Sequence, residues 1–248
     1  MVPADIPRED APTLAAIGVL AYVGCDVLHE LLGHGGACLV TGGRAASLSA
    51  FHFQCFGGWQ RLVCAAGILA NLATAILAWL ALRMARKGSP RAAVFLWLFL
   101  AYNAFTGFGN IVTSVLSNNG DVANAFYGSG WNWRPGMMAV GVGGYIAAIW
   151  LVHRARPRPS WQMVLIPYFS AAVVACAAAA LNSIVGQLSA LTSAVTTTLG
   201  CWGFLLLPPI ASAPVPGAPV ERSRAWIIAA IACAAVFIFL LGPGHRFR

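Results

Sequence analysis

The sequence predicts an all-α polytopic membrane protein that folds as a single domain over residues 1–248. Hydrophobic residues make up 59% of the chain, charged residues make up 9%, and the mean hydropathy is +0.76. A soluble domain carries about 25% charged residues, so this composition excludes a water-soluble globular fold and a disordered chain. The net charge of +8 comes from short basic clusters between apolar runs. That distribution is typical of cytoplasmic loops and excludes a nucleic-acid interface.

Apolar runs divide the chain after a tail at residues 1–11. A transmembrane helix needs about 20 residues, and seven runs approach or exceed that length: Pro12–Val40, Trp59–Met84, Ala92–Leu116, Gly136–His153, Trp161–Leu181, Leu188–Leu207 and Ala225–Leu241. The first run is too long for one simple span, so we expect it to break near Gly35 and Gly36. The Leu188–Leu207 run is rich in threonine, and the count falls from seven helices to six if this segment is re-entrant.

The segment between the first two runs has a different pattern. Residues Ala45–Phe53 alternate partly between small or polar and apolar side chains, which predicts a short strand-like hairpin. Cys38 and Cys55 flank this segment and would form a disulfide if it faces an oxidising compartment. The other five cysteines lie inside apolar runs, where we expect them to be small buried side chains.

The loops rich in Lys and Arg predict the orientation in the membrane. Three basic loops fall on one side of a seven-span protein, and they contain Arg83, Arg86, Lys87 and Arg91, then Arg154, Arg156 and Arg158, then Arg222 and Arg224. We therefore place these loops and the N-terminus in the cytoplasm. The hairpin then faces outward, together with Arg246 and Arg248.

Acidic residues inside the first run point to a functional site. Asp26 and Glu30 lie in this run, where each acid costs about 2.5–3.5 kcal/mol on insertion scales. Glu30 stands between two histidines in His29-Glu30-Leu31-Leu32-Gly33-His34. Zinc proteases have the related pattern H-E-x-x-H, in which both imidazoles bind one metal ion and the glutamate is the general base.

The spacing here is one residue longer than in that pattern. On a regular α-helix, residues i and i+5 lie about 140° apart, which is too far for two imidazoles to share an ion. We therefore predict a π-type turn or an unwound segment within Glu30–His34, made easier by Gly33. In the alternative interpretation the helix stays regular, and Glu30 and His34 form a hydrogen-bonded pair.

Three motifs in register resemble the site-2 protease family of intramembrane zinc metalloproteases, particularly its small bacterial branch. They are H-E-L-L-G-H at His29–His34, T-G-G-R at Thr41–Arg44 and A-A-G-I-L-A-N at Ala65–Asn71. The resemblance implies a metalloprotease core over residues 12–135, additional transmembrane helices over residues 136–248, and a place in the bacterial inner membrane. It also implies a site near the cytoplasmic side, whereas the basic loops predict one near the outer face.

The resemblance assigns roles to five residues. His29 and His34 would bind Zn²⁺, Glu30 would be the general base, and Asp121 would be the third ligand. Asp121 lies in N-N-G-D-V, where the glycine precedes the aspartate and the family's prolines are missing. Asn71 would stabilise the oxyanion or hold the substrate strand.

Other assignments remain open at this point. Asp26 or His52 would replace Asp121 if that residue is not a ligand, and His52 would otherwise shuttle a proton or have no role. Asn71 would instead join two helices by a hydrogen bond.

The function expected from these residues is intramembrane zinc proteolysis of a membrane-embedded peptide segment. The substrate would be a transmembrane peptide or membrane protein, and the strand-like segment would pair with its unwound backbone. The alternatives are a non-proteolytic metal-binding relative with a binding or regulatory role, a membrane zinc hydrolase of lipid amides, and a transporter. The sequence does not set the substrate sequence or the oligomeric state.

Overall fold

The computed structural model describes residues 9–85, 88–157, 160–206 and 219–247. Six helical segments in this part of the chain are long and apolar enough to cross a membrane: Ala11–Val40, Gln60–Ala85 (α3), Pro90–Ser117 (α4), Arg134–Ala155 (α6), Gln162–Ala180 (α7) and Arg224–Leu241. The first comprises α1 (Ala11–Val27), the π-helix η1 (Leu28–Gly35) and α2 (Gly36–Val40). The last comprises α9 (Arg224–Ala235) and the π-helix η3 (Val236–Leu241). The predicted helical architecture is confirmed at this level.

Local sequence signals explain where the helices begin and end. The Asp10 carboxylate caps α1 by accepting a hydrogen bond from the Thr13 backbone amide at 3.0 Å. Helix α4 begins at Pro90, whose fixed φ and missing N–H suit a first helical turn. The same helix ends at Asn118, which takes the left-handed conformation with φ 54°.

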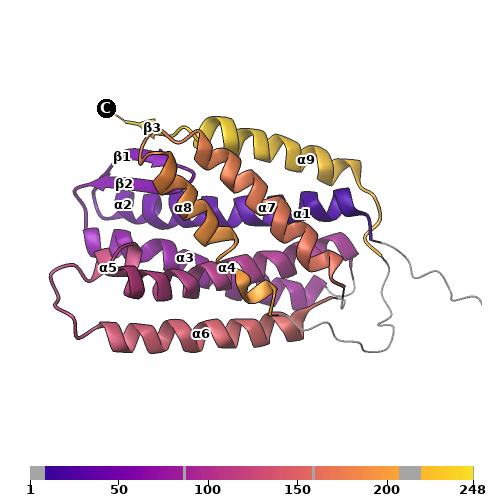
Figure 1. The fold of residues 1–248 in the computed structure, drawn as a ribbon, viewed down its shortest axis with the longest axis horizontal. Helices are drawn as coiled ribbons and strands as arrows, with labels where there is room; N and C mark the ends of the chain where they lie inside the picture. Colours follow the sequence, from indigo (N-terminus) through magenta and orange to yellow (C-terminus); the bar gives the residue numbers. More distant parts are fainter. Residues whose placement is uncertain (1–8, 86–87, 158–159, 207–218, 248) are drawn as a thin grey trace, which may run out of the picture.

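The sixth apolar run does not form a membrane-length helix within the described residues, so the prediction of a seventh full helix was wrong. It forms α8 (Gln187–Thr198), of 12 residues, and the 3₁₀ turn η2 (Trp202–Phe204). Threonines that enrich this run donate hydrogen bonds to carbonyls of their own helix. The chain still runs from one end of the bundle toward the other here (Figure 1).

The two ends of the bundle differ in composition. The basic end contains the start of α1, the α3–α4 and α6–α7 connections and the start of α9, and the hairpin end lies opposite (Figure 1). The Asp10 backbone amide donates to the Val220 carbonyl at 2.9 Å, and Arg91 lies 3.7 Å from Glu221. The described basic residues of the predicted cytoplasmic loops therefore share one end: Arg83, Arg91, Arg154, Arg156, Arg222 and Arg224. Arg86, Lys87, Arg158 and Arg248 lie outside the described residues.

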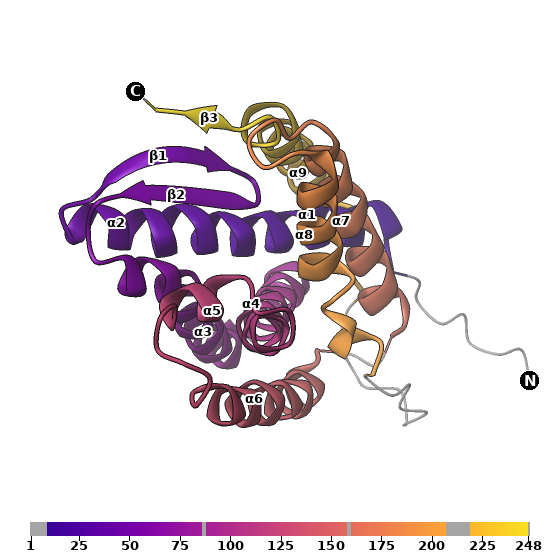
Figure 2. The same cartoon turned by 60° about the vertical axis from the view of Figure 1, so that its left-hand side comes forward.

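Helices α1 and α4 form the middle of the bundle, and α6 and α9 lie on opposite sides of it (Figure 2). The core includes the fully buried side chains Trp97, Tyr102 and Phe105 of α4. By contrast, only 11% of the last apolar segment is buried inside the protein. This outward apolar surface is what a lipid-facing helix requires.

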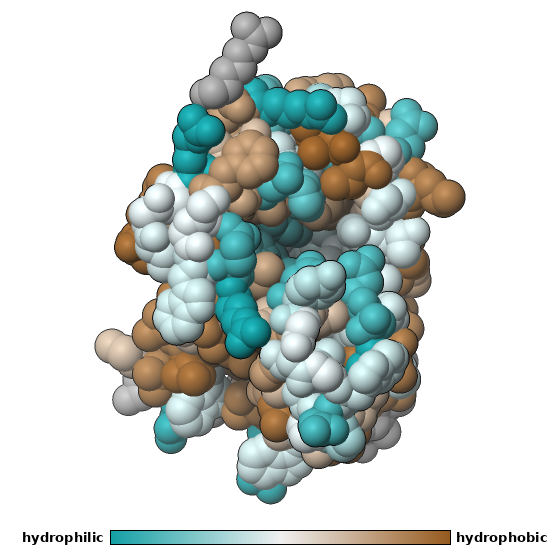
Figure 3. Space-filling model, turned by 90° about the vertical axis from the view of Figure 1, so that its left-hand side faces the viewer, coloured by the Kyte–Doolittle hydropathy of each residue, from teal (hydrophilic) through white to brown (hydrophobic). Residues whose placement is uncertain are grey.

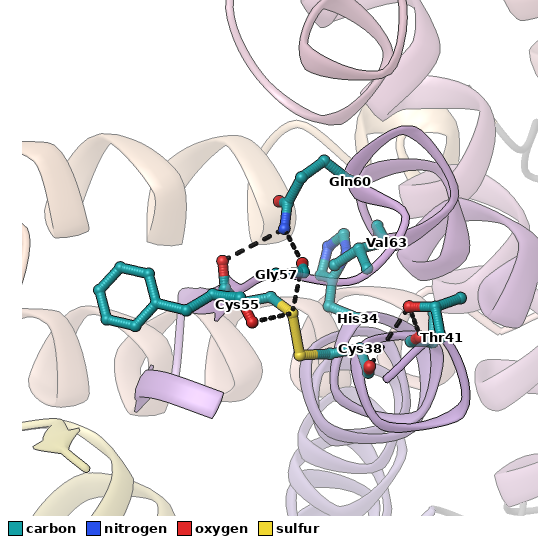
Figure 4. The surroundings of a disulfide bond; sticks show 9 residues. His34, Cys38, Thr41, Cys55, Gly57, Gln60 and Val63 are labelled. Carbon is teal, nitrogen blue, oxygen red and sulfur yellow. Dashed lines mark hydrogen bonds between the residues drawn. A yellow bond between two sulfur atoms is a disulfide. The ribbon is translucent and has the colours of Figure 1, made fainter. Parts of the chain in front are cut away.

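The predicted hairpin is present as β1 (Arg44–Ser49) and β2 (His52–Phe56), which pair in antiparallel fashion. A third strand, β3 (His245–Arg246), pairs with Ser47 and Leu48, so the strand order is β2-β1-β3. A disulfide joins Cys38 of α2 to Cys55 of β2 (Figure 4). The hairpin is thereby fastened to the helix that follows η1.

The predicted π-type distortion is confirmed, and its extent is wider than expected. The π-helix covers Leu28–Gly35, and helical structure continues through Gly36 to Val40. The expectation that the first run breaks near Gly35 and Gly36 was wrong, because the wide π turn absorbs the extra residue without ending the helix.

Candidate metal centre

Three side chains from two separate segments meet at the hairpin end. His29 Nε2 lies 3.0 Å from Asp121 Oδ2, and His34 Nε2 lies 3.4 Å from Asp121 Oδ1. The two Nε2 atoms lie 3.2 Å apart. Both histidines come from η1, and Asp121 begins the short helix α5 (Asp121–Ala125). The structure thus brings together the three residues predicted as ligands, which could hold a metal ion.

The π-helix is what places both imidazoles on one side. Their rings meet edge to face, with centroids 4.8 Å apart, although the residues are separated by five positions. The two rings are also 7% and 6% exposed. A regular helix would turn them about 140° away from each other, so the alternative of a regular helix with a Glu30–His34 pair does not describe this chain.

Hydrogen bonds on the far side of each ring fix the tautomers. His29 Nδ1–H donates to Asn71 Oδ1 at 2.8 Å, and His34 Nδ1–H donates to the Val63 carbonyl at 2.6 Å. Both acceptors lie on α3 and carry no proton to give in return. Each Nε2 is therefore left with a free lone pair that points to the centre, as second-sphere contacts arrange metal-binding histidines.

Asn71 is itself held in place. Its side chain is completely buried, and its Nδ2 donates to Cys25 Sγ at 3.1 Å. These hydrogen bonds tie Asn71 to His29 and to α1, and Asn71 does not line the cavity described below. The contacts therefore favour a positioning role for Asn71. This role resembles the alternative from the sequence analysis, in which Asn71 joins two helices by a hydrogen bond, and the oxyanion role stays a prediction.

Asp121 is anchored from α4. Asn110 Nδ2 donates to Asp121 Oδ2 at 2.8 Å, and the Ser114 hydroxyl donates to Asn110 Oδ1 at 3.0 Å. Asn110 and Ser114 thus hold the Asp121 carboxylate in a fixed orientation.

The donor set is one that could hold a metal ion. Ligand atoms about 2.0–2.2 Å from a tetrahedral zinc lie about 3.3–3.6 Å from one another, and the separations here, which involve both oxygens of Asp121, are slightly shorter to similar at 3.0, 3.2 and 3.4 Å. Two nitrogen lone pairs and a carboxylate that converge on one point repel one another unless a cation lies among them. Two imidazoles and one carboxylate also leave a fourth position open, as in catalytic zinc sites.

Glycines let the helices come close enough to build this centre. A Cβ atom at Gly67 of α3 would lie 2.5 Å from His34 Nε2 and 2.6 Å from His29 Nε2. A Cβ atom at Gly33 would lie 2.7 Å from the Gly67 Cα. The absence of both side chains keeps the space beside the two nitrogen atoms open.

The centre borders a polar cavity of about 350 Å³. His29, Asp121, Glu30, Asp26 and His52 line it, together with hydroxyl-bearing residues of α4 and α8. Figure 3, which views the hairpin end, shows hydrophilic residues around a hollow on this face. One oxygen of Glu30, Oε2, is buried and has no hydrogen-bond partner among the described residues. Glu30 therefore lines the cavity with a carboxylate that has an unused acceptor oxygen.

Asp26 and His52, the alternative ligands, lie outside the convergent set within the described residues. Both face the same cavity from α1 and β2. Burial lowers the pKa of His52.

Comparisons with protein-family models, curated proteins and solved structures find no match to this chain. The resemblance to site-2 proteases therefore depends on the three motifs and on the geometry of the residues they contain.

Sequence reasoning missed the residues that support the ligands. Val63 accepts the hydrogen bond of His34 through its backbone carbonyl, which no side-chain pattern can indicate. Cys25 accepts the hydrogen bond of Asn71, but in the sequence it is indistinguishable from other small apolar residues of the run. Asn110 had a detectable signal, because an amide inside an apolar helix needs a partner. Gly67 lies inside the A-A-G-I-L-A-N motif, yet only the packing of α3 against η1 shows what it does.

Proposed function

We propose that this chain is an integral membrane zinc hydrolase that cleaves a peptide bond in a membrane-embedded segment. One observation carries the proposal: His29, His34 and Asp121 converge at 3.0–3.4 Å beside a cavity that Glu30 also lines, and one Glu30 oxygen is buried without a hydrogen-bond partner among the described residues. This combination of two imidazoles, one carboxylate and an adjacent free carboxylate is the donor set of zinc peptidases.

The residues would divide the chemistry as follows. A zinc ion, when bound, lowers the pKa of a water in its open position to about 7 and polarises a carbonyl. Glu30 would take the proton of the attacking water and give it to the leaving amide nitrogen, because it borders the cavity but is not in the convergent set. Asn71 and the Val63 carbonyl would keep both imidazoles in the metal-binding tautomer.

The substrate would have to be extended, because a helical peptide bond hides its carbonyl. An extended segment needs a sheet edge to pair with. Strand β1 has β2 on one side and β3 on the other, so we assign the pairing to the outer edge of β2. That edge adjoins the cavity through His52.

The composition of the two ends suggests an orientation in the bilayer. The basic end would face the cytoplasm with the N-terminus, and the metal centre would lie near the outer face of a bacterial inner membrane. The Cys38–Cys55 disulfide supports this orientation, because such bonds persist in oxidising compartments.

The deciding experiment compares wild-type protein with Glu30→Gln after purification in detergent. We expect one zinc per chain in both, and at least about 10²–10⁴-fold slower cleavage of transmembrane test peptides by Glu30→Gln. Glu221→Gln, an exposed change at the basic end, is the control and should keep both properties.

Other outcomes would point elsewhere. Loss of zinc in Glu30→Gln would make Glu30 a ligand and overturn its role as base. A zinc-loaded wild type that hydrolyses lipid amides instead of peptides would indicate a lipid hydrolase, and one inert toward both would indicate a binding or regulatory protein.

A further inference from the structure

A second cavity lies beside the metal cavity and has the opposite character. It has a volume of about 480 Å³ and lies between α4, α6 and the α8–η2 segment. Its apolar lining includes Phe105, Val112, Val142, Ile146, Ile149 and Trp202. We call this space the lateral chamber. Its volume falls in the range of about 300–1,000 Å³ that ligand sites occupy.

The lateral chamber and the metal cavity share one wall. Five residues line both spaces, and all five have polar side chains: Thr106, Asn110 and Thr113 of α4, and Thr196 and Thr197 of α8. We call this set the polar wall. Asn110 also donates to the metal-centre residue Asp121 at 2.8 Å. A molecule in the lateral chamber is thus separated from the metal centre by a single layer of side chains.

The chamber faces the lipid side of the bundle. Val142, Ile146 and Trp202, on its rim, are 42%, 62% and 56% exposed. Helix α6 is among the least buried of the membrane-length segments, with 22% of its apolar window inside the protein. Because these exposed apolar side chains lie on helices of membrane length and on η2, a bilayer around the bundle would give sideways access to the chamber.

We propose that the lateral chamber holds the apolar side chains next to the bond that is cut, while the substrate backbone crosses the polar wall toward the metal centre. This inference rests on the proposed function, and it names the substrate class as a peptide segment with large apolar residues flanking the cleavage site.

The polar wall favours a peptide over an acyl chain. A backbone that leaves its helix in a membrane exposes N–H groups, and each costs several kcal/mol without a partner. The hydroxyls of Thr113 and Thr196 donate to carbonyls of their own helices at 2.9–3.2 Å, which leaves their oxygen lone pairs as acceptors. A row of acceptors suits successive peptide N–H groups, whereas an acyl chain has none to offer.

Filling the chamber tests the inference. Val142→Trp should occupy the chamber without touching the metal centre, and Val140→Trp is the matched control. Val140 lies on the same helix, is 52% exposed, and lines neither cavity. The probes are two synthetic peptides, each with one transmembrane segment that contains an Ala-Ala bond. In the first peptide Leu and Phe flank this bond, and in the second peptide only Ala residues flank it.

We expect Val142→Trp to keep one zinc per chain and to raise KM for the Leu/Phe peptide at least tenfold, with little change for the Ala peptide. Val140→Trp should resemble wild type with both peptides. Equal effects of the two tryptophans, or equal effects on the two peptides, would overturn the inference.

A binding measurement separates this inference from the proposed function. In Glu30→Gln protein, p-benzoylphenylalanine at position Ile146 should crosslink the Leu/Phe peptide on illumination, and the same group at Val140 should not. Crosslinking without cleavage by wild type would sink the protease proposal and leave the chamber as a peptide site. The absence of a crosslink at position 146 would overturn the chamber assignment. The same holds if an excess of free fatty acid abolishes the crosslink but an excess of unlabelled peptide does not.

Discussion

Gly67 shows how one missing side chain sets the chemistry of the centre. It lies on α3 opposite both imidazoles, where an added Cβ would come within 2.5–2.6 Å of each Nε2. Real Cβ atoms do not approach nitrogen that closely, so the rings or the helix would have to move. The glycine keeps the ligand lone pairs accessible from the α3 side.

We expect Gly67→Ala to lose its zinc and its peptide cleavage while it stays folded. Zinc per chain, measured by elemental analysis after purification, should fall from about one to near zero. Gly143→Ala is the control, because a Cβ at this helical glycine of α6 meets nothing within 4 Å. Full zinc occupancy in Gly67→Ala would show that the centre does not bind metal where the three donors converge.

Asn71 gives a second test at this scale. Removing a hydrogen-bond partner of a metal-binding histidine typically costs 10–100-fold in metal affinity, so Asn71→Ala should show a loss of that order in competition with a chromogenic chelator. Asn103→Ala is the control, since Asn103 is also fully buried but donates to the Phe99 carbonyl of its own helix. Unchanged zinc affinity with strongly reduced cleavage would instead favour the oxyanion role.

At the scale of elements, the contact between η1 and α3 decides whether the site forms. The π turn lines up His29 and His34, and α3 supplies both Nδ1 acceptors. Gly33 lies where the two helices touch, with an added Cβ 2.7 Å from the Gly67 Cα and 2.9 Å from the Ala66 carbonyl oxygen. The disulfide at Cys38 and Cys55 holds β2 against the same region (Figure 4).

Gly33→Ala should separate these two helices. Overpacking a close contact typically costs about 1–3 kcal/mol, so we expect a lower unfolding temperature in detergent and weaker zinc binding. Gly36→Ala, three residues later in the same helix, is the matched control because its Cβ meets nothing within 4 Å. Alanine is the better helix former by about 1 kcal/mol, so the control should be neutral or stabilised. Identical shifts in both variants would exclude a packing role for Gly33.

At the scale of the whole molecule, the basic clusters and the metal centre lie at opposite ends of the bundle. The basic end carries six described arginines of the loops and no part of the metal centre. The hairpin end carries the three convergent ligands, the disulfide and the β-sheet. A membrane between the two ends would leave the centre near the outer surface.

Single cysteines at the two ends should therefore differ in accessibility. Ser129 lies in the exposed loop before α6 at the hairpin end, and Ser160 lies before α7 at the basic end. The two variants are Ser129→Cys and Ser160→Cys. In intact cells a membrane-impermeant maleimide should label Ser129→Cys, and it should label Ser160→Cys only after lysis. Labelling of the wild-type protein is subtracted as the background from its own cysteines. Labelling in the reverse order would place the centre on the cytoplasmic side, as the resemblance to site-2 proteases implies.

The helical class, the hairpin and the π turn could be predicted from the sequence alone. These features are local or nearly so: apolar length sets the helices, and the i,i+5 spacing of His29 and His34 requires a wide turn. His29 and His34 belong to a local pattern, whereas Asp121 was assigned by the resemblance to site-2 proteases.

How these parts meet depends on tertiary packing. Asn71 and the Val63 carbonyl contact the histidines across 42 and 29 residues of sequence, and such pairings depend on how η1 packs against α3. The sixth run forms a helix of 12 residues whose Thr196 and Thr197 line the metal cavity. The lateral chamber has no sequence signature at all, because its walls come from α4, α6 and η2, which only packing brings together.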